Sequence, residues 1–575
     1  MTYTLGLNFL HSDTSACIFE NGTLIAAAEE ERFTRIKHTT TFPYMSINFC
    51  LNKLDLDISK IDVITVNSNP FASFFDKAIF LIKNPKSLPI AFNSLNNSSK
   101  KYNLKNYIAK IDKDKIFSGK IKFIDHHESH MASSLFFNNF KECVNLSIDG
   151  FGDFSSCAWG FSMNKNLKID KKVYFPHSLG IFYQAMTQYL GFKNYGDEYK
   201  VMGLSSYGKP KYADLISKLI YKKKEGFELN LNYFVHHKKQ ILSTNKNAQA
   251  VYKDLYSNRL IALLGDEREK DENLTIKHMD LAKSIQTVYE DIFFHILNNL
   301  HKKYKNDNLS LSGGCAMNSV ANGKILKNTN FKNIYISPNP GDAGGAIGSA
   351  CVHINEYLKK EIKVKNYAYL GSKYEFNEIK EILDNNKIIK NYKVEYFSDY
   401  EVSKRISKKL AESKVIGWFQ GETEWGPRAL GNRSILADAR NPNIKDIINS
   451  KIKRRESFRP FAPSILFEKK EEWFQIENEV PFMSEVYPIK VDKLKLLPGI
   501  THVDGTGRLQ TVKKSSNIKY YNLINSFYEL TGVPIILNTS FNENEPIVNS
   551  PEEAINCFHR THMDLLVIGN YIISR

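Results

Sequence analysis

The sequence predicts an α/β protein of two domains, and three observations lead to this prediction. Strand patterns alternate with helical patterns along a chain of 575 residues, which is long enough for several structural units. A strand–turn–strand pattern occurs twice in the first part of the chain, and two glycine-rich turns follow it. We place the domain boundary near residue 365, so that residues 1–364 and 365–575 form separate domains.

The repeated pattern sets "TLGLNFLHSDTSACIFENG" against "VNLSIDGFGDFSSCAWGFS". Each copy carries a D-x-S-x-C turn, from Asp13 to Cys17 and from Asp153 to Cys157. Such turns present backbone N–H groups and small hydroxyls, which suit phosphate oxygens. Two ordinary β-hairpins would give the same pattern. A duplicated α/β lobe with a cleft between its halves accounts for both copies.

Two glycine turns each stand between an expected strand and an expected helix. The first contains Gly313 and Gly314, and the second contains Gly341, Asp342 and Gly344. A strand that leads through glycines into a helix start is an anion-binding arrangement, although glycines also serve simple tight turns. Together with the duplicated hairpins, the two turns resemble the actin-like ATPase fold.

Composition and charge indicate a globular protein. Hydrophobic residues make up 42% and charged residues 24%, which are ordinary values. We expect a cytoplasmic location and no membrane partner, because no signal-peptide pattern and no run of ~18 apolar residues is seen. The seven scattered cysteines argue against disulfides and cysteine zinc fingers. The net charge of +16 comes from dispersed lysines, so we expect no nucleic-acid partner.

The segment "KFIDHHESHMASS" at 122–134 contains the first candidate for metal chemistry. If a helix follows the strand, His126 and His130 are spaced i, i+4 and lie on one face, where two imidazoles can reach one ion. His127 then points away. Asp149 and Asp342 stand at the expected cleft turns and supply the carboxylates that would complete a site. The alternative is a solvated helix start.

The second candidate is a basic stretch at 421–466. Turn and packing residues bracket its cations, which a merely solvated charged face would not need, and fixed guanidinium groups suit bidentate phosphate binding. Further along, Arg508 stands in "THVDGTGRLQTV", and Asn538, Thr539 and Ser540 are expected just after a strand. The cations that stand out in the stretch are Arg428, Arg433, Arg440, Lys451, Lys453, Arg454, Arg455 and Arg459.

Ten blocks of the chain, in order, resemble the signature blocks of the nodulation and antibiotic O-carbamoyltransferases, the group that includes the tobramycin and cephamycin enzymes. The resemblance covers nearly the whole chain. The blocks are "AEEERFTRIKH", "DHHESHMASS", "SIDGFGD", "GDEYKVMGLSSYG", "LSGGCAMNS", "NPGDAGGAIG", "WGPRALGNRSILADAR", "KIKRRESFRPFAP", "THVDGTGRLQTV" and "LNTSFN".

The resemblance implies an actin-like (ASKHA) N-terminal domain, akin to the tRNA threonylcarbamoyl transferase, and a YrdC-like α/β C-terminal domain. It implies an ATP-dependent carbamoyltransferase. In the C-terminal domain, carbamoyl phosphate and ATP with Mg²⁺ form carbamoyl adenylate. In the N-terminal domain, Fe²⁺ or another divalent metal assists transfer of the carbamoyl group to a hydroxyl of a small-molecule or sugar acceptor.

The resemblance also implies roles for individual residues. The implied metal ligands are His126, His130, Asp149 and Asp342. The implied contacts of carbamoyl phosphate and ATP are Arg428, Lys453, Arg459, Arg508 and Ser540. The implied nucleotide contacts in the N-terminal domain are Gly150, Gly152, Lys200, Gly313, Gly314 and Asn318, and the implied acceptor contacts are Arg32, Lys37 and His38.

One departure concerns catalysis. The family usually shows His directly followed by Asp in the first hairpin, whereas this chain has His11, Ser12 and Asp13. Either the histidine has shifted by one position or Ser12 replaces it. We take His11 and Asp13 as the catalytic candidates, His11 as the general base; a His11 that only lines the turn is the alternative.

Two other functions compete with this interpretation. A sugar kinase or chaperone-like ATPase would share the actin-like fold but leave the arginine-rich domain unexplained. A tRNA-modifying protein would suit the basic charge, but that function normally divides the two domains between separate chains. The sequence leaves the acceptor open between O- and N-carbamoylation, and it leaves the metal and a homodimer open as well.

Overall fold

The computed structural model describes residues 1–9, 11–84, 87, 103–456 and 458–575, and the description below refers to these residues. The chain divides into two compact units, Met1–Lys365 and Asn366–Arg575. Each unit combines a β-sheet with helices, which confirms the predicted α/β class.

The first sheet of the N-terminal unit runs β15-β3-β2-β1-β4-β5. Strands β1, β2 and β3 form an antiparallel meander, and β4 and β5 continue in parallel beside β1. The apolar side chains of these strands pack on helices around Phe9, Phe42 and Ile64. The strand bounds are β1 Tyr3–Asn8, β2 Ser15–Glu20, β3 Thr23–Glu29, β4 Val63–Val66, β5 Lys120–Phe123 and β15 Lys363–Val364.

The second sheet runs β14-β13-β6-β7-β8 and repeats the order of the first. Again three antiparallel strands come first, and two parallel strands are added beside the first of them. The same order in both sheets confirms the predicted duplication and the actin-like fold of this unit. The strand bounds are β6 Glu142–Gly152, β7 Ser155–Met163, β8 Asn166–Tyr174, β13 Asn308–Ser312 and β14 Asn333–Ile336.

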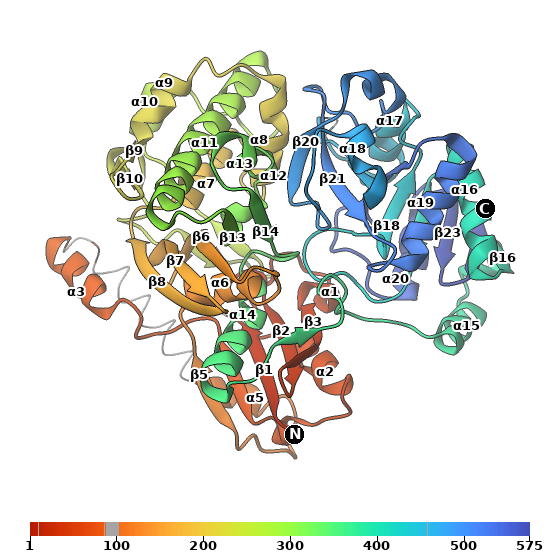
Figure 1. The fold of residues 1–575 in the computed structure, drawn as a ribbon, viewed down its shortest axis with the longest axis horizontal. Coiled ribbons are helices and arrows are strands. Elements are labelled where there is room, and N and C mark those ends of the chain that lie inside the picture. The colour runs from red at the N-terminus through yellow and green to blue at the C-terminus, as the bar shows by residue number, and fades with distance from the viewer. Residues whose placement is uncertain (10, 85–86, 88–102, 457) are drawn as a thin grey trace. The chain divides into compact units, whose positions relative to one another are not determined.

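Two helices lie between these sheets (Figure 1). Helix α14, Gly344–His353, packs on β1 and β4, helix α6, His126–Leu135, packs on β6 and β13, and the two helices contact each other. The expected helix at the histidine segment and the strand before it are therefore confirmed. Other helices of the unit include α1 Glu31–Thr34, α2 Tyr44–Asn52, α3 Phe74–Lys83, α5 Leu104–Ile108, α7 Leu179–Tyr189, α8 Glu198–Leu204, α9 Ala213–Ile216, α10 Asn258–Leu264, α11 Ile276–Tyr304, α12 Ser319–Asn322 and α13 Ile325–Asn328.

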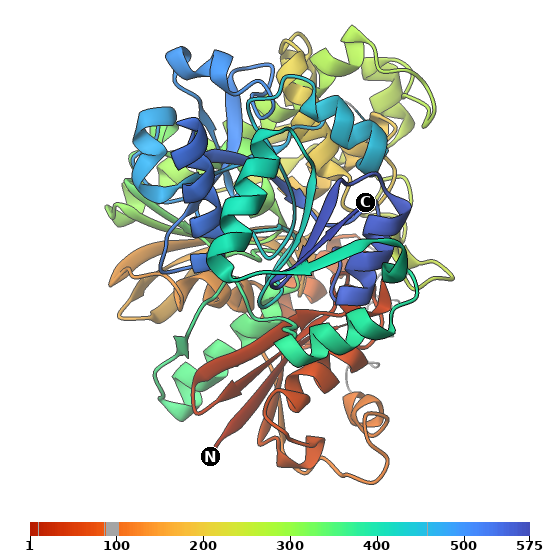
Figure 2. The same ribbon diagram turned by 90° about the vertical axis from the view of Figure 1, so that its right-hand side faces the viewer.

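The C-terminal unit, coloured from teal to blue in Figure 2, is built on a mixed sheet. Its strands run in the order β16-β24-β23-β17-β18-β22-β19-β21-β20. The strand bounds are β16 Lys393–Tyr396, β17 Ile416–Phe419, β18 Arg433–Ala437, β19 Ala462–Leu466, β20 Glu485–Pro488, β21 Thr506–Val512, β22 Ile535–Ser540, β23 Leu565–Ile568 and β24 Tyr571–Ser574.

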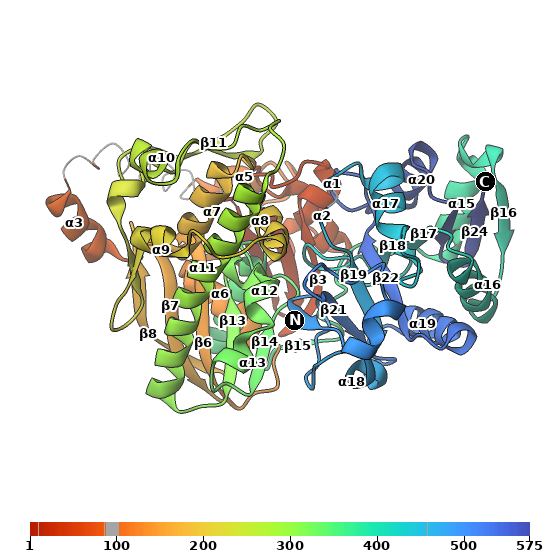
Figure 3. The same cartoon turned by 90° about the horizontal axis from the view of Figure 1, so that it is seen from above.

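Helices cover this sheet and bury one continuous apolar core. Helices α16 and α19 lie side by side, as Figure 3 shows. Asn538, Thr539 and Ser540 were expected just after a strand, but they lie inside β22, where Thr539 pairs with Ile435 of β18. The helix bounds are α15 Phe376–Asn385, α16 Asp399–Ala411, α17 Ile444–Ile448, α18 Lys470–Trp473, α19 Ile518–Thr531 and α20 Pro551–Arg560. A YrdC-like fold for this unit stays a prediction.

Candidate metal centre and anion site

Helix α6 begins at the end of β5 because Asp125 caps it. The Asp125 carboxylate accepts hydrogen bonds from the backbone N–H groups of His127 and Glu128, at 3.1 and 3.2 Å. The cap fixes the first turn of the helix, so His126 and His130 project from the same side, one turn apart. Their ring centroids are 4.5 Å apart.

Four side chains converge at this end of the helix. The Nε2 atoms of His126 and His130 lie 3.0 and 3.2 Å from Asp149 Oδ2. They lie 3.6 and 3.4 Å from Asp342 Oδ1. The two histidines are fully buried, and all four ligand atoms lie within 4.8 Å of one another. Two imidazoles and two carboxylates at this spacing can hold a divalent transition metal.

The electrostatics of this group fit a cation. Burial lowers the pKa of His130, but hydrogen bonds and charge from Asp149 and Asp342 outweigh it and raise the pKa to about 10. Burial likewise opposes ionisation of Asp149, yet the two histidines hold its pKa well below the ordinary value. Asp342 Oδ1 is buried, and in the described part of the chain its contacts with the two histidines are long, at 3.6 and 3.4 Å. The histidines hold protons between themselves and the two aspartates. A metal ion binds such a group by replacing these protons.

His127 does not belong to this group, as its place in the helix predicts. Its Nδ1 lies 2.8 Å from Ser147 Oγ. Burial, together with the neighbouring His126 and His130, lowers the pKa of His127 to about 3, so the ring stays neutral. His127 is therefore a packed, hydrogen-bonded histidine of the helix.

Three of the glycines predicted to bind a nucleotide lie close to the metal group, the name used below for His126, His130, Asp149 and Asp342. A Cβ at Gly152 would lie 2.0 Å from the His126 ring, and one at Gly313 would lie 2.2 Å from Ile148 O. The backbone N–H of Gly314 donates to Asp149 Oδ1 at 3.0 Å. A Cβ at Gly150, in contrast, would meet nothing within 4 Å. These glycines make room for the ligands and orient them, and their contact with a nucleotide stays a prediction.

The other two predicted nucleotide contacts are engaged within the protein. Lys200 Nζ lies 2.9 Å from Asp197 Oδ1. Asn318 caps α12 by accepting from Ala321 N–H at 3.1 Å, and its amide donates to Gln286 Oε1 at 3.1 Å. Nucleotide binding by Lys200 and Asn318 stays a prediction.

The first hairpin brings the catalytic candidates to the metal group. The His11 ring lies 5.5 Å from the His126 ring, centroid to centroid. Ser12 Oγ lies 3.4 Å from Asp342 Oδ2 and is also hydrogen-bonded to the Tyr195 hydroxyl. Asp13 Oδ1 lies 2.7 Å from His38 Nδ1. Tyr195 was missed by sequence reasoning, since no local pattern marks it.

The predicted acceptor contacts occupy different environments. Arg32 is buried and forms an ion pair with Glu29, with 2.9 Å between Nη2 and Oε2. His38 is partly exposed, and its pKa is raised to about 9 because the charge and hydrogen bond of Asp13 outweigh burial. Lys37 is also partly exposed. The structure therefore places His38 and Lys37 where a ligand can reach them, whereas Arg32 is already neutralised.

In the C-terminal unit, Lys453 is fixed by neutral oxygens. Its Nζ donates to Ser540 O at 2.5 Å, Ser540 Oγ at 3.2 Å, Asn542 O at 2.8 Å and Asn542 Oδ1 at 2.6 Å. The structure thus joins two predicted phosphate contacts, Lys453 and Ser540. Arg459 forms an ion pair with Glu456, at 2.8 Å.

A second group in this unit gathers three arginines. Burial, and then the charges of Arg428 and Arg455, hold the pKa of the Arg508 guanidinium well below its usual range. Arg508 Nε is buried and has no hydrogen-bond partner in the described part of the chain. Guanidinium groups that repel one another in this way are candidates for binding an anion, since bound phosphate would neutralise them. Arg455 had been included in the basic stretch, but among these three arginines only Arg428 and Arg508 were implied contacts of carbamoyl phosphate and ATP.

Two other arginines of the basic stretch are structural. The buried Arg433 donates to Ser372 O at 3.0 Å and to Gly421 O at 3.2 Å, and its guanidinium lies 3.6 Å from the centroid of the Phe419 ring. Arg440 pairs with Asp438 at 2.7 Å. Both guanidinium groups are thus engaged within the protein, Arg433 by backbone carbonyl groups and Arg440 by a carboxylate, and phosphate binding by either stays a prediction.

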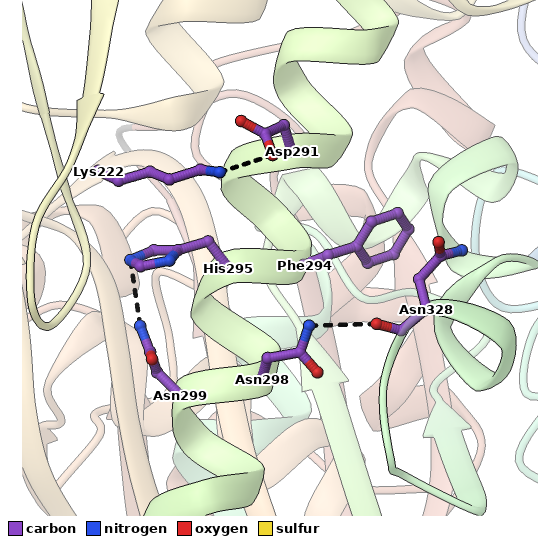
Figure 4. A pocket seen from close by; sticks show the side chains of 7 residues that line it. All are labelled: Lys222, Asp291, Phe294, His295, Asn298, Asn299 and Asn328. Carbon is purple, nitrogen blue, oxygen red and sulfur yellow. Dashed lines mark hydrogen bonds and ion pairs between the residues drawn. The ribbon is translucent and has the colours of Figure 1, made fainter.

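A hollow of about 380 Å³ is lined by residues of α11 and of neighbouring segments (Figure 4). Its side chains bind one another. Lys222 pairs with Asp291 at 2.6 Å, and the Asn298 amide donates to Asn328 O at 3.1 Å. The hollow shares no residue with the predicted sites. Its lining is Lys222, Asp291, Phe294, His295, Asn298, Asn299 and Asn328.

The helices of the described residues include none that is long and apolar enough to cross a membrane.

Two family models match the chain. The model described as the carbamoyltransferase N-terminus matches residues 3–351, and that described as the carbamoyltransferase C-terminus matches residues 407–575. An uncharacterized protein of Synechocystis sp. is 38% identical over 611 residues, which cover 100% of this chain and 97% of that protein. Nodulation protein NolNO of Sinorhizobium fredii is 36% identical over 576 residues, which cover 99% of this chain and 79% of NolNO.

Among solved structures, HypF of T. kodakarensis aligns with a TM-score of 0.32 at 12% identity, covering 61% of this chain and 47% of HypF. Component A of the (R)-2-hydroxyglutaryl-CoA dehydratase of Acidaminococcus fermentans aligns with a TM-score of 0.31 at 15% identity, covering 61% of this chain and 97% of that protein. The fold assignment rests on the sheet orders described above and not on these likenesses.

The two glycines of β6 give a matched test of the metal group. We expect Gly152→Ala to weaken metal binding by about 10- to 100-fold, because its methyl group would displace the His126 ring, whereas Gly150→Ala should bind metal like the wild type. Metal affinity of the purified proteins measures this, with His126→Ala as the reference for a lost ligand. Equal affinities of the two glycine variants would contradict the geometry.

The structural role of Arg433 gives a second prediction. We expect Arg433→Lys to destabilise the C-terminal unit by about 3 kcal/mol, because buried carbonyl groups lose their donors. Arg440→Lys, at a partly exposed pair, should cost less than about 1 kcal/mol. Tryptophan fluorescence during unfolding reports on this unit, since Trp418, Trp425 and Trp473 all lie in it. Similar losses for both variants would show that Arg433 has no special role.

Proposed function

Because the chain belongs to the carbamoyltransferase family, we propose that it transfers a carbamoyl group from carbamoyl phosphate, with ATP, to a hydroxyl of a small-molecule or sugar acceptor. The resemblance indicated by the sequence blocks is thus confirmed at the level of the family. The observation that carries the proposal is the buried pair of histidines with two aspartates, in a chain that also holds a separate group of arginines.

The arginine group supports a first step in the C-terminal unit. Arg428, Arg455 and Arg508 would neutralise carbamoyl phosphate and the phosphates of ATP, so that the two anions can approach each other. Water would first cleave carbamoyl phosphate into carbamate and inorganic phosphate. A carbamate oxygen would then attack the α-phosphorus of ATP, forming carbamoyl adenylate as the bond to pyrophosphate breaks. Lys453 and Ser540 lie together and would contact the same phosphates, and Arg459 would join them by exchanging its pairing with Glu456.

The histidine–aspartate group supports transfer in the N-terminal unit. His126, His130, Asp149 and Asp342 would hold Fe²⁺ or another divalent ion, which supplies a Lewis acid for the carbamoyl oxygen. His11, whose ring lies beside that of His126, would take the proton of the acceptor hydroxyl. His38 and Lys37 would bind the acceptor, with Asp13 orienting His38 through its Nδ1.

We also propose that a nucleotide binds beside the histidine–aspartate group. The open space beside Gly150 suits an approaching phosphate, and Lys200 would contact it. We infer a cytoplasmic enzyme.

The products of ATP turnover test the function. Incubation with labelled carbamoyl phosphate and ATP should yield AMP and pyrophosphate, and turnover should require carbamoyl phosphate. ADP formed without carbamoyl phosphate would indicate a kinase-like or chaperone-like ATPase instead. Adding candidate nucleotide sugars and identifying the labelled product would then define the acceptor.

The separation of the two groups predicts a separable loss of function. We expect Arg508→Ala to reduce carbamoyl adenylate formation by about 100- to 1,000-fold, because an anion loses its preorganised donor. Transfer from supplied carbamoyl adenylate should stay near the wild-type rate. Loss of both steps in a folded Arg508→Ala protein would contradict the assignment of one step to each unit.

His11 gives the corresponding prediction for transfer. We expect His11→Asn to lower carbamoyl transfer by about two to four orders of magnitude, the usual range for loss of a general base, while adenylate formation continues. Rates of both half-reactions check this. Normal transfer by His11→Asn would show that His11 only lines the turn.

A further inference from the structure

The two oxygens of Asp342 face in different directions. Oδ1 faces the histidines, at 3.6 Å from His126 Nε2 and 3.4 Å from His130 Nε2. Oδ2 faces Ser12 Oγ, at 3.4 Å. One oxygen is thus available to a metal ion, and the orientation of the carboxylate depends on what holds the other. Carboxylates that bind metals are commonly fixed by such a second hydrogen bond.

Ser12 is held rigidly enough to serve as that second partner. It is buried, with 4% of its surface exposed. The side-chain amide of Asn8 donates to the backbone carbonyls of Ser12 and Asp13, at 3.2 and 2.8 Å, and so fixes the turn. The turn needs such support because Asp13 has a φ of 58°. A serine hydroxyl has one hydrogen to donate, and when it donates to Asp342 its oxygen can accept another.

Tyr195 supplies the hydrogen that Ser12 can accept. The Tyr195 hydroxyl is hydrogen-bonded to Ser12 Oγ, across 183 positions of sequence. The resulting chain of donors runs from Tyr195 to Ser12 to Asp342. It reaches the metal group from the connection between α7 and α8, a segment that provides none of the four ligands.

The tyrosine ring is held from two sides. It stacks on Tyr252, with 5.4 Å between centroids and 20° between planes. It also meets the edge of His38, at 5.1 Å. Next to it, Gly196 has a φ of 83° and lies so close to His38 that an added Cβ would be 2.6 Å from Nε2. The hydroxyl is therefore placed by packing and not by chance rotation of a surface side chain.

We propose that Tyr195 is a positioning residue that acts through Ser12 to hold the Asp342 carboxylate in its metal-binding orientation. The inference rests on the metal centre of the proposed function, but not on the carbamoyl reaction. The competing explanation is that Tyr195 contributes only its ring, as packing for Tyr252 and His38. Removal of the hydroxyl alone distinguishes the two, because Tyr195→Phe preserves the ring.

The test is the affinity of the full-length, chelator-stripped protein for Fe²⁺ and Co²⁺, measured by titration without carbamoyl phosphate or ATP. We expect Tyr195→Phe and Ser12→Ala each to weaken binding by about 10- to 100-fold and to alter the visible spectrum of bound Co²⁺. The double variant should lose no more than the weaker-binding single variant, since both changes break one chain. Ser12→Thr keeps a hydroxyl and should bind more tightly than Ser12→Ala.

Tyr252→Phe is the matched control, because it removes a hydroxyl from the stacked partner and leaves the chain to Asp342 intact. It should bind both metals like the wild type. Wild-type affinity and spectrum in Tyr195→Phe would overturn the proposal, as would fully additive losses in the double variant or a wild type that binds neither metal. A protein that shows the expected coupling but no carbamoyl transfer would overturn the proposed function and leave this inference standing.

Discussion

The close contact between helices α6 and α14 determines where the metal ligands meet. A Cβ at Gly348 would lie 1.7 Å from Ser129 O, and one at Gly6 would lie 2.1 Å from Ala346 O. Side chains at these positions would separate the helices and the strand, because the distance between packed elements depends on the residues at the contact. The glycines therefore let the start of α6 and the turn before α14 approach each other. His126 and Asp342 meet because these two segments do.

Each unit contains a buried group of ionisable side chains that strongly perturb one another. In the N-terminal unit, two carboxylates are largely shielded from water together with two imidazoles. In the C-terminal unit, Arg428 and Arg455 act against the ionisation of Arg508. Burial of like charges costs free energy unless an opposite charge is supplied, so strongly perturbed groups of this kind are typical of functional sites. Arg433 differs from Arg508, because backbone carbonyl groups of the protein accept hydrogen bonds from its guanidinium.

The sequence predicted those parts of the site that depend on short-range spacing. The i, i+4 spacing of His126 and His130 follows from helical geometry, and the repeated hairpins revealed the duplication. The sequence alone could not predict the contact of Tyr195 with Ser12, because only the tertiary fold brings these two segments together. It also could not separate Arg433 from Arg428, since both stand in the same turn-rich stretch. Gly152 and Gly314 were interpreted as nucleotide contacts, whereas in the structure they lie against His126 and Asp149, a position that depends on the partner segment.

The metal group is assembled from distant segments, and this couples metal binding to folding of the N-terminal unit. His126 and His130 come from α6, Asp149 comes from β6, and Asp342 comes from the turn before α14. An unfolded chain cannot bring these atoms within 4.8 Å of one another without a large loss of conformational entropy. An ion that binds only the folded arrangement therefore stabilises that arrangement. The added free energy of unfolding grows with the logarithm of the ratio of the ion's concentration to its dissociation constant. Because α6 packs on the second sheet and α14 on the first, that stabilisation acts on the association of the two lobes.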